Sequence, residues 1–482
     1  MAGKRRSGFA NDRRAYRYGS GLPTATPTPT PTPPICPPIT LADITLPDGF
    51  TLAADTTILA CQTLTIPSGS SLVIPVGLTI TNNGTIDNVN GGTITNDNGG
   101  TITNNGTITN NSGSTITNIS GGTISNNKMI NNIGATDNYG SVANNNGGII
   151  DTNSGGIITN YGGGTIDNNG GGAIDTNSGG TIINLSSGTI TNKLNGIITN
   201  GADGSGIFTN EGFINNLRGS IVNNDSFTNR GAIANNNGGS PTGGGEIVNT
   251  SVGTITNDGG GNITNEFAGT ITNNGGIINI EQTSKITNNT GGEITNDSGG
   301  AINLTNQGKI DNTGGTIQNT NGSTISTFTK GKITNAGVIY NFLSTINIYN
   351  AKVFGTPNPG LDNQGTIYNQ STININHGPI INNSGGTIDN VGGTITNGIG
   401  DTSGGTINNA GGTIAFDATS TFTNESDGII YNNSSGTITN NGTFTNVSGG
   451  VVNNANSLST CGSGTLNGTN VIVATGTLCP YL

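Results

Sequence analysis

Six aspartates share one place in a short repeated phrase, directly after an isoleucine, and are the first candidates for chemistry. They are Asp87, Asp151, Asp167, Asp175, Asp311 and Asp389. Asp151 and Asp175 are 24 residues apart, so a chain that coils with that period would hold their carboxylates about 5 Å apart. That separation suits a retaining glycosidase pair or a calcium site. Polysaccharide cleavage also needs Arg, Lys or His on the active face. These residues are scarce here, so we predict no enzymatic activity.

Other catalytic and cofactor chemistry has little support. His377 is the only histidine, and beside Gly378 and Pro379 it is expected to be a surface loop residue. One histidine and four distant cysteines do not give the ligand spacing of a zinc cluster. No Gly-Gly pair is followed by the Gly-Lys-Ser/Thr of a phosphate-binding loop. We therefore expect no cofactor and no metal.

The cysteines lie near the two ends of the chain, as Cys36 and Cys61 and as Cys461 and Cys479. The separation within each pair is close to one coil of the period described below, and side chains one coil apart are within reach of a disulfide. We predict one disulfide at each end, where exposed sheet edges would otherwise fray. The alternative is four small buried thiols.

Threonine pairs of the form Thr-x-Thr recur along the chain. Ladders of this motif on one flat solenoid face are typical of some ice-binding proteins. Here Thr101/Thr103 and Thr107/Thr109 lie on consecutive segments and hence on different faces, and other copies are interrupted by Asp, Ala or Ser. Ice binding is therefore retained only as an alternative.

The element that must position all these residues is a repeat of the form Gly-Thr-Ile-Thr-Asn, as in residues 92–96, 106–110 and 436–440. Near the start of the array the gaps between successive isoleucines run six, eight and eight, so three segments make a period of 22. Between Ile150 and Ile198 every gap is eight, and the period becomes 24. A fixed internal period of this length indicates a solenoid.

Each segment has the pattern of a short β-strand. In residues 93–96 the side chains alternate faces, so Ile94 and Asn96 point inward when the threonines point outward. Thr and Ile favour extended backbone, and Asn-x-Gly-Gly tolerates the positive φ of a corner. Three strands and three corners per period predict an all-β fold. It is a single-stranded, three-sided parallel β-helix of about 22–24 residues per coil, which we expect to be right-handed.

An Asn two places after each Ile predicts hydrogen-bonded ladders along the axis. Adjacent coils would stack Asn on Asn about 4.8 Å apart, whereas an unpartnered buried amide would cost a few kcal/mol. The array allows roughly 18 coils and a rod on the order of 85 Å. Disorder is the alternative, since only 4% of residues are aromatic and 9% charged. A disordered chain, however, has no reason to keep the isoleucine period.

Charge separates the N-terminus from the rest of the chain. There are 15 Lys and Arg against 26 Asp and Glu, for a net charge of −11. Six of the basic residues lie in the first 17 positions: Lys4, Arg5, Arg6, Arg13, Arg14 and Arg17. The remainder is acidic and has no basic face for nucleic acid. We predict that the basic tail is an anchor; a solubilising or nuclear-targeting role is the alternative.

Composition divides the chain into five regions. Residues 1–22 are predicted to be a flexible, disordered tail, and residues 23–34, which alternate Thr and Pro, a polyproline II spacer. Residues 35–63 fit an N-terminal cap, 64–454 the solenoid repeats, and 455–482 a C-terminal cap. The tail lacks the apolar core of a Sec signal peptide, and no run of about 20 apolar residues predicts a membrane span.

The repeat is interrupted at residues 236–246, 351–364 and 398–405. We interpret these interruptions as loops at corners, which often gather on a working surface. Residues 340–354 are the most aromatic stretch and include Tyr340, Phe342 and Tyr349. We interpret this stretch as core filling, with an exposed contact patch as the alternative.

The Gly-Thr-Ile-Thr-Asn and Leu-Thr-Ile-Pro units resemble the repeats of β-solenoid (parallel β-helix) surface proteins, such as virion fibre or spike proteins, phage tail fibres and filamentous adhesins. The resemblance extends over most of the chain; it implies the fold class and a structural role, and it transfers no site residue. A basic tail, a spacer and a rod fit a capsid-associated virion fibre or spike, made in the host cytoplasm and exposed on the virion surface. A cell-surface adhesin is the first alternative. A polysaccharide-active β-helix enzyme and an ice-binding protein are further ones.

The expected partners follow from this organisation. The tail would bind a capsid or another structural protein, and the rod a host glycan or surface receptor. Exposed sheet edges also favour a homo-oligomer such as a trimer. Nucleic acid is not an expected partner.

Overall fold

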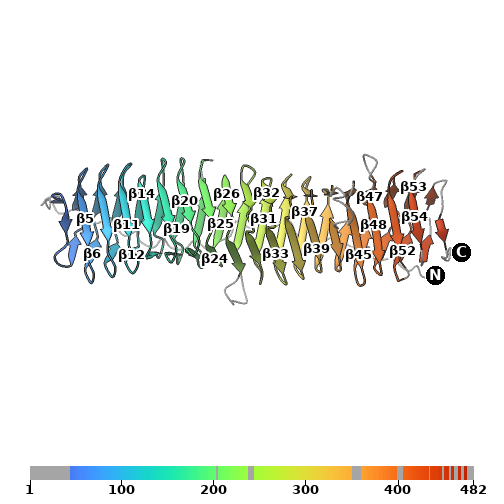
Figure 1. Ribbon diagram of the computed structural model, residues 1–482, viewed down its shortest axis with the longest axis horizontal. Coiled ribbons are helices and arrows are strands. Elements are labelled where there is room, and N and C mark those ends of the chain that lie inside the picture. Colours follow the sequence, from blue (N-terminus) through green and yellow to red (C-terminus); the bar gives the residue numbers. More distant parts are fainter. Residues whose placement is uncertain are drawn as a thin grey trace, which may run out of the picture. The chain divides into compact units, whose positions relative to one another are not determined.

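The structure of this chain is a computed structural model that describes most of the repeat array. The described residues are 44–201, 205–236, 244–349, 360–376, 378–398, 405–433, 435–447, 450–454, 457–460, 465–467 and 472–474. Together they form 57 strands and no helix. The strands wind around one axis and advance along it from the N-terminal to the C-terminal end of the solenoid (Figure 1).

The strands belong to three sheets, which we call A, B and C, and each sheet takes every third strand. Sheet A contains β1 (Ile44–Thr45), β4 (Thr63–Ile66), β7 (Thr85–Asn88), β10 (Thr107–Asn110), β13 (Met129–Asn132), β16 (Ile149–Thr152), β19 (Ala173–Thr176), β22 (Ile197–Asn200), β25 (Ser220–Asn223), β28 (Glu246–Asn249), β31 (Thr270–Asn274), β34 (Glu293–Asp297), β37 (Thr316–Thr320), β40 (Val338–Phe342), β43 (Thr366–Asn369), β46 (Thr387–Asn390), β49 (Thr413–Phe416), β52 (Thr437–Asn440) and β55 (Ser457–Thr460). Sheet B contains β2 (Phe50–Thr51), β5 (Ser71–Ile74), β8 (Thr93–Asn96), β11 (Thr115–Asn118), β14 (Ala135–Asn138), β17 (Ile157–Asn160), β20 (Thr181–Asn184), β23 (Ile207–Asn210), β26 (Ser226–Asn229), β29 (Thr254–Asn257), β32 (Ile277–Ile280), β35 (Ala301–Leu304), β38 (Thr324–Thr327), β41 (Thr345–Ile348), β44 (Thr372–Ile375), β47 (Thr394–Asn397), β50 (Thr421–Asn424), β53 (Thr443–Asn446) and β56 (Thr465–Asn467). Sheet C contains β3 (Thr56–Ile58), β6 (Thr79–Asn82), β9 (Thr101–Asn104), β12 (Thr123–Asn126), β15 (Ser141–Asn144), β18 (Thr165–Asn168), β21 (Thr189–Asn192), β24 (Phe213–Leu217), β27 (Ala232–Asn236), β30 (Asn262–Asn265), β33 (Lys285–Asn289), β36 (Lys309–Thr313), β39 (Lys332–Asn335), β42 (Leu361–Asn363), β45 (Pro379–Asn383), β48 (Thr406–Ala410), β51 (Ile429–Asn432), β54 (Val451–Asn454) and β57 (Ile472–Ala474).

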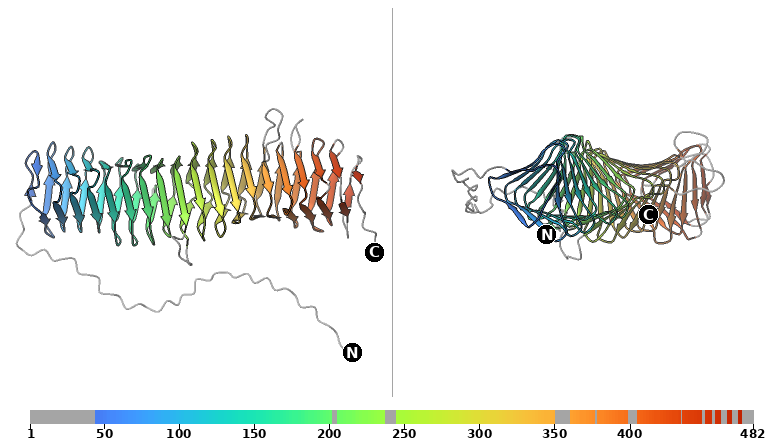
Figure 2. Two further views of the ribbon diagram at one scale, coloured as in Figure 1. Left: turned by 60° about the horizontal axis from the view of Figure 1, so that its bottom comes forward. Right: turned by 60° about the vertical axis from the view of Figure 1, so that its left-hand side comes forward.

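Each strand pairs in parallel with its equivalents one coil before and one coil after. On β10, for example, Ile108 lies opposite Ile86 of β7 and Ile130 of β13. The coil contains 22 residues here and 24 residues further along the rod. The predicted all-β, three-sided parallel solenoid is therefore confirmed. The predicted period of 22–24 residues holds for most coils, while single coils are as short as 18 or as long as 30 residues. The 19 strands per sheet in the described part correspond to roughly 85–90 Å of stacked coils, seen side-on in Figure 2.

Side chains alternate between the interior and the outer faces. In β9, Ile102 is 2% and Asn104 0% exposed, while Thr101 and Thr103 lie half-buried on the outside. The inward isoleucines stack coil on coil into one column per sheet. Because burial of each isoleucine side chain stabilises by roughly 1.5–3 kcal/mol, these columns are the main cohesive element.

The inward asparagines form the predicted ladders. On sheet C the Nδ2 of each asparagine donates to the Oδ1 of the asparagine one coil further on. This chain is unbroken from Asn82 to Asn432, at 2.7–2.9 Å. Nδ2 also donates to backbone carbonyls, as Asn192 does to Gly196 and Ser220. The amide–amide bonds of the ladder all point from one coil to the next, so each amide polarises its neighbour.

Corners of two lengths explain the two gaps between successive isoleucines. Asn105 and Gly106 connect β9 to β10, whereas residues 97–100 connect β8 to β9. Gly99 in the longer corner has a φ of 77°, which favours glycine. A Cβ on Gly106 in the shorter corner would overlap the carbonyl oxygen of Gly84, one coil earlier. The two corners therefore need glycine for different reasons, conformation in one and close approach in the other.

Candidate functional site

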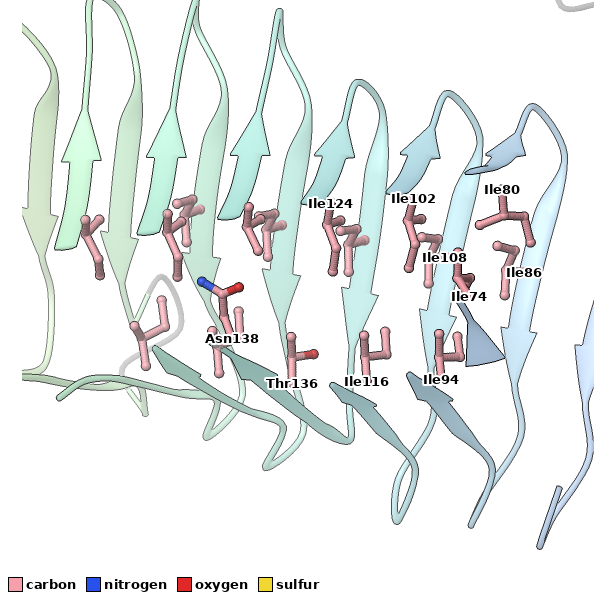
Figure 3. A pocket seen from close by; sticks show the side chains of 18 of the residues that line it. Ile74, Ile80, Ile86, Ile94, Ile102, Ile108, Ile116, Ile124, Thr136 and Asn138 are labelled. Carbon is pink, nitrogen blue, oxygen red and sulfur yellow. The ribbon is translucent and has the colours of Figure 1, made fainter. Parts of the chain in front are cut away.

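The interior of the first half of the solenoid leaves no room for a ligand. The space between the side-chain columns from Leu72 to Phe208 amounts to about 40 Å³, against roughly 300–1,000 Å³ for small-molecule sites. Figure 3 shows the isoleucines facing one another across this space, with Thr136 and Asn138 among them. Candidate sites in this part of the chain must therefore lie on the outer faces and at the corners.

The predicted carboxylate pair lies on sheet A, where Asp151 of β16 is opposite Asp175 of β19. Burial raises the pKa of the Asp175 carboxyl; a hydrogen bond with Thr199 opposes this shift, and the charge of Asp151 adds to it. Asn177 Nδ2 donates to Asp151 Oδ1 at 2.8 Å. The strands β13, β16, β19 and β22 carry no Arg, Lys or His. The predicted adjacency is confirmed, but these strands do not supply the basic groups that sugar cleavage requires.

A cluster of two tyrosines and one aspartate was not predicted from the sequence. At the corner after β14 and β17, Tyr139 and Tyr161 stack with ring centroids 4.1 Å apart. A hydrogen bond with Tyr139 is the largest cause of the raised pKa of Tyr161. Burial raises the pKa of the Asp137 carboxyl, and a hydrogen bond with Tyr161 partly offsets this increase. The signal was available, because the two tyrosines are one repeat period apart. Across the described residues, no group of three or more His, Cys, Asp or Glu could hold a metal ion.

The aromatic stretch after residue 340 divides between core and surface. Ile346 and Ile348 are buried, as predicted, but Tyr340, Phe342 and Leu343 are 43%, 45% and 59% exposed. The core-filling interpretation is wrong for these three residues. The reason is the alternation along β40, where the preceding Ile339 takes the inward position and Tyr340 and Phe342 therefore point outward.

These residues belong to a larger surface cluster on sheet A and the corner after it. Tyr340 lies opposite Tyr368 of β43, with ring centroids 5.2 Å apart and planes 10° apart. Tyr368 is itself 38% exposed. We call Tyr340, Phe342, Leu343 and Tyr368 the aromatic patch. It places four large side chains together on a surface where threonine and asparagine dominate.

Three lysines form a column on sheet C, at the first position of β33, β36 and β39. They are Lys285, Lys309 and Lys332. Lys309 Nζ is 2.6 Å from Asp311 Oδ1, and Lys332 Nζ is 3.0 Å from Asp362 Oδ2. Because such surface pairs are worth only about 0–1 kcal/mol, they set the local charge of the face rather than the stability of the fold. The column comes from the coil register and was not anticipated from the sequence.

Threonine pairs are in register over two coils near the N-terminal end and over three coils near the C-terminal end. Consecutive copies lie on different faces as predicted, since β9 belongs to sheet C and β10 to sheet A. On sheet B, however, β47, β50 and β53 bring three copies into register: Thr394/Thr396, Thr421/Thr423 and Thr443/Thr445. Within the described strands this is the longest such array. It covers three coils and does not make a whole face of the solenoid.

Most of the other predicted site residues lie outside the described residues. They are Lys4, Arg5, Arg6, Arg13, Arg14, Arg17, Cys36, Cys461, Cys479 and His377, together with residues 237–243, 350–359 and 399–404 of the interruptions. Cys61 lies at the corner after β3 with a φ of 68°, and no free cysteine occurs among the described residues. The two disulfides stay predictions. Thiol titration in denaturant without reductant tests them, and four free thiols would refute them.

No protein-family model and no curated protein matches the chain. Among solved structures, it is similar to one described as the "Crystal structure of TibC-catalyzed hyper-glycosylated TibA55-350 fragment". The identity is 18%, the match covers 80% of this chain and 99% of that one, and the TM-score is 0.21. A similarity this low carries no argument, so the class of the protein follows from its own strand pairing. It is a rod-like, three-sided parallel β-solenoid. No helix in the described ranges is long and apolar enough to cross a membrane.

Proposed function

We propose that this chain is a structural, non-enzymatic rod of a surface fibre or spike. Its basic N-terminal tail anchors it to a capsid or another structural protein, and the virion surface is its location. The observation that carries the proposal is a solenoid whose inward positions in coil after coil serve only cohesion, through isoleucine columns and amide ladders. A cell-surface adhesin with the same rod is the second candidate.

The uniform coils support a role as a stiff spacer. Each coil contacts only the coils before and after it, so the length of the rod scales with the number of repeats. Backbone pairing in all three sheets and the amide ladders resist bending and fraying together. The outer positions, largely Thr and Asn, are free to vary without disturbing the interior. Such a rod holds its two ends roughly 85 Å apart.

The charge distribution supports anchoring through the tail. Six of the 15 Lys and Arg lie in the first 17 positions, while the whole chain has a net charge of −11. A tail of this kind is attracted to acidic surfaces, and the attraction weakens as salt rises. The Thr-Pro segment at residues 23–34 would separate the anchor from the rod.

Two variants test the anchor. One lacks residues 1–22; the other keeps the length but replaces Lys4, Arg5, Arg6, Arg13, Arg14 and Arg17 with Gln. We expect both to lose incorporation into particles while the strand signal in circular dichroism stays unchanged. Normal incorporation of both variants would contradict the proposal. Labelling of intact cells with an antibody against the rod would instead favour the adhesin.

A further inference from the structure

The aromatic patch is not required by the fold. The outward position that Tyr340 occupies on β40 is taken by Gln318, Thr295 and Thr272 in the three preceding coils of sheet A. Those coils have the same pairing and the same amide ladder. Clustered apolar side chains on the surface of a protein are unfavourable in water and mark binding sites. The pairing of the coils therefore does not need tyrosine at this position.

Leu343 lies at a corner where the backbone takes a positive φ. Its φ is 50°, in a region that a leucine seldom adopts. The same corner one coil earlier uses Asn321 and Gly322 at φ 51° and 79°, which suit that region. Other corners also hold non-glycine residues in this region, such as Phe267 at a φ of 48°, so the conformation is a property of the corners. Leu343 contributes to the patch through its side chain, which is 59% exposed.

Polar groups border the stacked tyrosines along the rod axis. On the preceding coil Gln318 lies opposite Tyr340 and donates a hydrogen bond to Glu293. On the following coil Asp389 lies opposite Tyr368. The strands β34, β37, β40, β43 and β46 contain no Lys or Arg. The border is therefore acidic and disfavours anionic ligands.

We propose that the aromatic patch binds a neutral polysaccharide of hexopyranose units that runs along the rod. Because Tyr340 and Tyr368 cover one face of each other, the C–H faces of the sugar rings pack on the exposed edges and outer faces of the two rings. The hydroxyls reach the amide of Gln318 and the carboxylate of Asp389. A stable protein interface needs roughly 20–30 residues a side, far more than this patch offers, so a slender chain fits better than a second copy. Polysaccharide binding by the aromatic patch does not depend on the N-terminal tail. A role for this binding in surface attachment rests on the proposed function.

Titration of the full-length chain with defined sugars tests this. The chain has nine tyrosines and no tryptophan, so tyrosine emission is not masked by energy transfer to indole. Maltohexaose, cellohexaose and chitohexaose are the neutral probes, and a galacturonic acid hexamer is the acidic control. We expect at least one neutral hexamer to change the emission and to give a binding isotherm by calorimetry, and the acidic hexamer to give neither.

The decisive variant is Tyr340→Thr/Tyr368→Thr, which introduces the residue type already present at Thr272 and Thr295. We expect at least about tenfold weaker binding with an unchanged Tm. Tyr431→Thr, which removes a 40% exposed tyrosine on sheet C, is the matched control and should bind normally.

Three outcomes overturn the proposal: no neutral hexamer binds, the double variant binds like the wild type, or the acidic hexamer binds equally well. The proposal would also be overturned if the wild type and the Tyr431→Thr control sediment as dimers and the double variant sediments as a monomer. That result would assign the patch to contact with a second copy of the chain. The same titration on a chain lacking residues 1–22 separates this proposal from the anchor, because sugar binding should survive that deletion.

Discussion

Sheets B and C fill the same inward position in two different ways. On sheet C the last inward residue of the strand is asparagine in every coil from Asn82 to Asn432, and the amide ladder has no break. On sheet B the asparagines stop at Asn257 and resume at Asn397. Between them stand Ile280, Leu304, Thr327, Ile348 and Ile375, all buried.

The ends of the ladders show what an interruption costs. Asn96 and Asn397 have an Oδ1 with no hydrogen-bond donor, because Ile74 and Ile375 occupy the preceding coil. On sheet B each ladder therefore starts with one unpaired acceptor, however many apolar residues precede it. Asn82 and Asn440 also follow an apolar residue, but there the backbone N–H of Gly84 or Gly442 donates to the Oδ1. The five residues between Asn257 and Asn397 are consecutive on sheet B, so together they leave only one unpaired acceptor, the Oδ1 of Asn397. A buried amide is stable here as a member of a chain of amides, and poorly stable alone.

The largest effect should come from breaking sheet C in its middle with Asn192→Leu. The change removes four hydrogen bonds, to Asn168, Asn216, Gly196 and Ser220, and leaves Asn216 Oδ1 unpaired. We expect the free energy of opening of the neighbouring coils to fall by roughly 3–4 kcal/mol. Faster amide hydrogen exchange in these coils measures this decrease. Thr191→Leu on the outer face is the control and should change exchange little. Equal effects of the two variants would refute the ladder argument.

The converse change on sheet B should cost somewhat less. Leu304→Asn puts an amide between Ile280 and Thr327. Its Nδ2 can donate to the buried, unpaired Oγ1 of Thr327, but its Oδ1 has no donor on the preceding coil. The lost apolar burial and the unpaired acceptor together should lower the free energy of unfolding by about 2–3 kcal/mol. The triple variant Ile280→Asn/Leu304→Asn/Thr327→Asn extends the ladder from Asn257. We expect it to cost less than the sum of the three single variants. Strict additivity in denaturant midpoints would contradict the idea that the cost belongs to boundaries.

A smaller, stabilising effect is expected at Thr136, which replaces isoleucine in the sheet B column between Ile116 and Ile158. Thr136→Ile fills interior space but loses the hydrogen bond from Thr136 Oγ1 to Asn132 Oδ1. The expected net gain is about 0.5–1 kcal/mol, seen as a higher Tm. Thr136→Val replaces the hydroxyl by a methyl group at nearly constant shape, so the difference between Thr136→Ile and Thr136→Val measures the additional methyl group alone. A lower Tm for Thr136→Ile than for Thr136→Val would show that the interior has no space for the larger side chain.

The smallest effects should come from the outer faces, and they should depend on pH in opposite directions. Burial raises the pKa of Asp175 above 3.8, so its stabilising contribution is present at low pH and is lost as pH rises through the folded pKa. At Asp417 burial favours a higher pKa, but hydrogen bonds from Ser420, Gly392 and Thr419 outweigh burial, and the pKa of Asp417 is lowered. The stabilising contribution of Asp417 is therefore present above pH 3.8 and is lost as the pH falls through the pKa of the folded state.

Melting curves of Asp175→Asn and Asp417→Asn between pH 3 and pH 6 check this contrast. We expect Asp175→Asn to raise the Tm relative to the wild type at pH 6 and to lose that advantage toward pH 3. Asp417→Asn should lower the Tm at pH 6 and approach the wild type at pH 3. Differences of the same sign would show that the two carboxyls do not act through these environments.

Local pattern was sufficient for the interior and for one surface pair. Alternation within a single strand predicts that Ile94 and Asn96 point inward, and the repeat period predicts that Asp151 and Asp175 are neighbours. The outward direction of Tyr340 also follows from alternation, although the aromatic content of residues 340–354 favours core filling. The pairing of Tyr340 with Tyr368 could not be predicted, because an interruption of the repeat separates them and lengthens the coil between their strands to 28 residues.

The sequence by itself determined which residue of each strand faces the core, because that depends only on the alternation of side chains along a strand and on a recurring Ile and Asn. Only the tertiary structure decided which outward residues are neighbours. Corners and loops of different length change the size of the coil, from 18 residues between Asn126 and Asn144 to 30 residues between Asn235 and Asn265. The backbone pairing absorbs these differences and keeps the columns aligned, so the aromatic patch and the lysine column exist only once the coils are stacked.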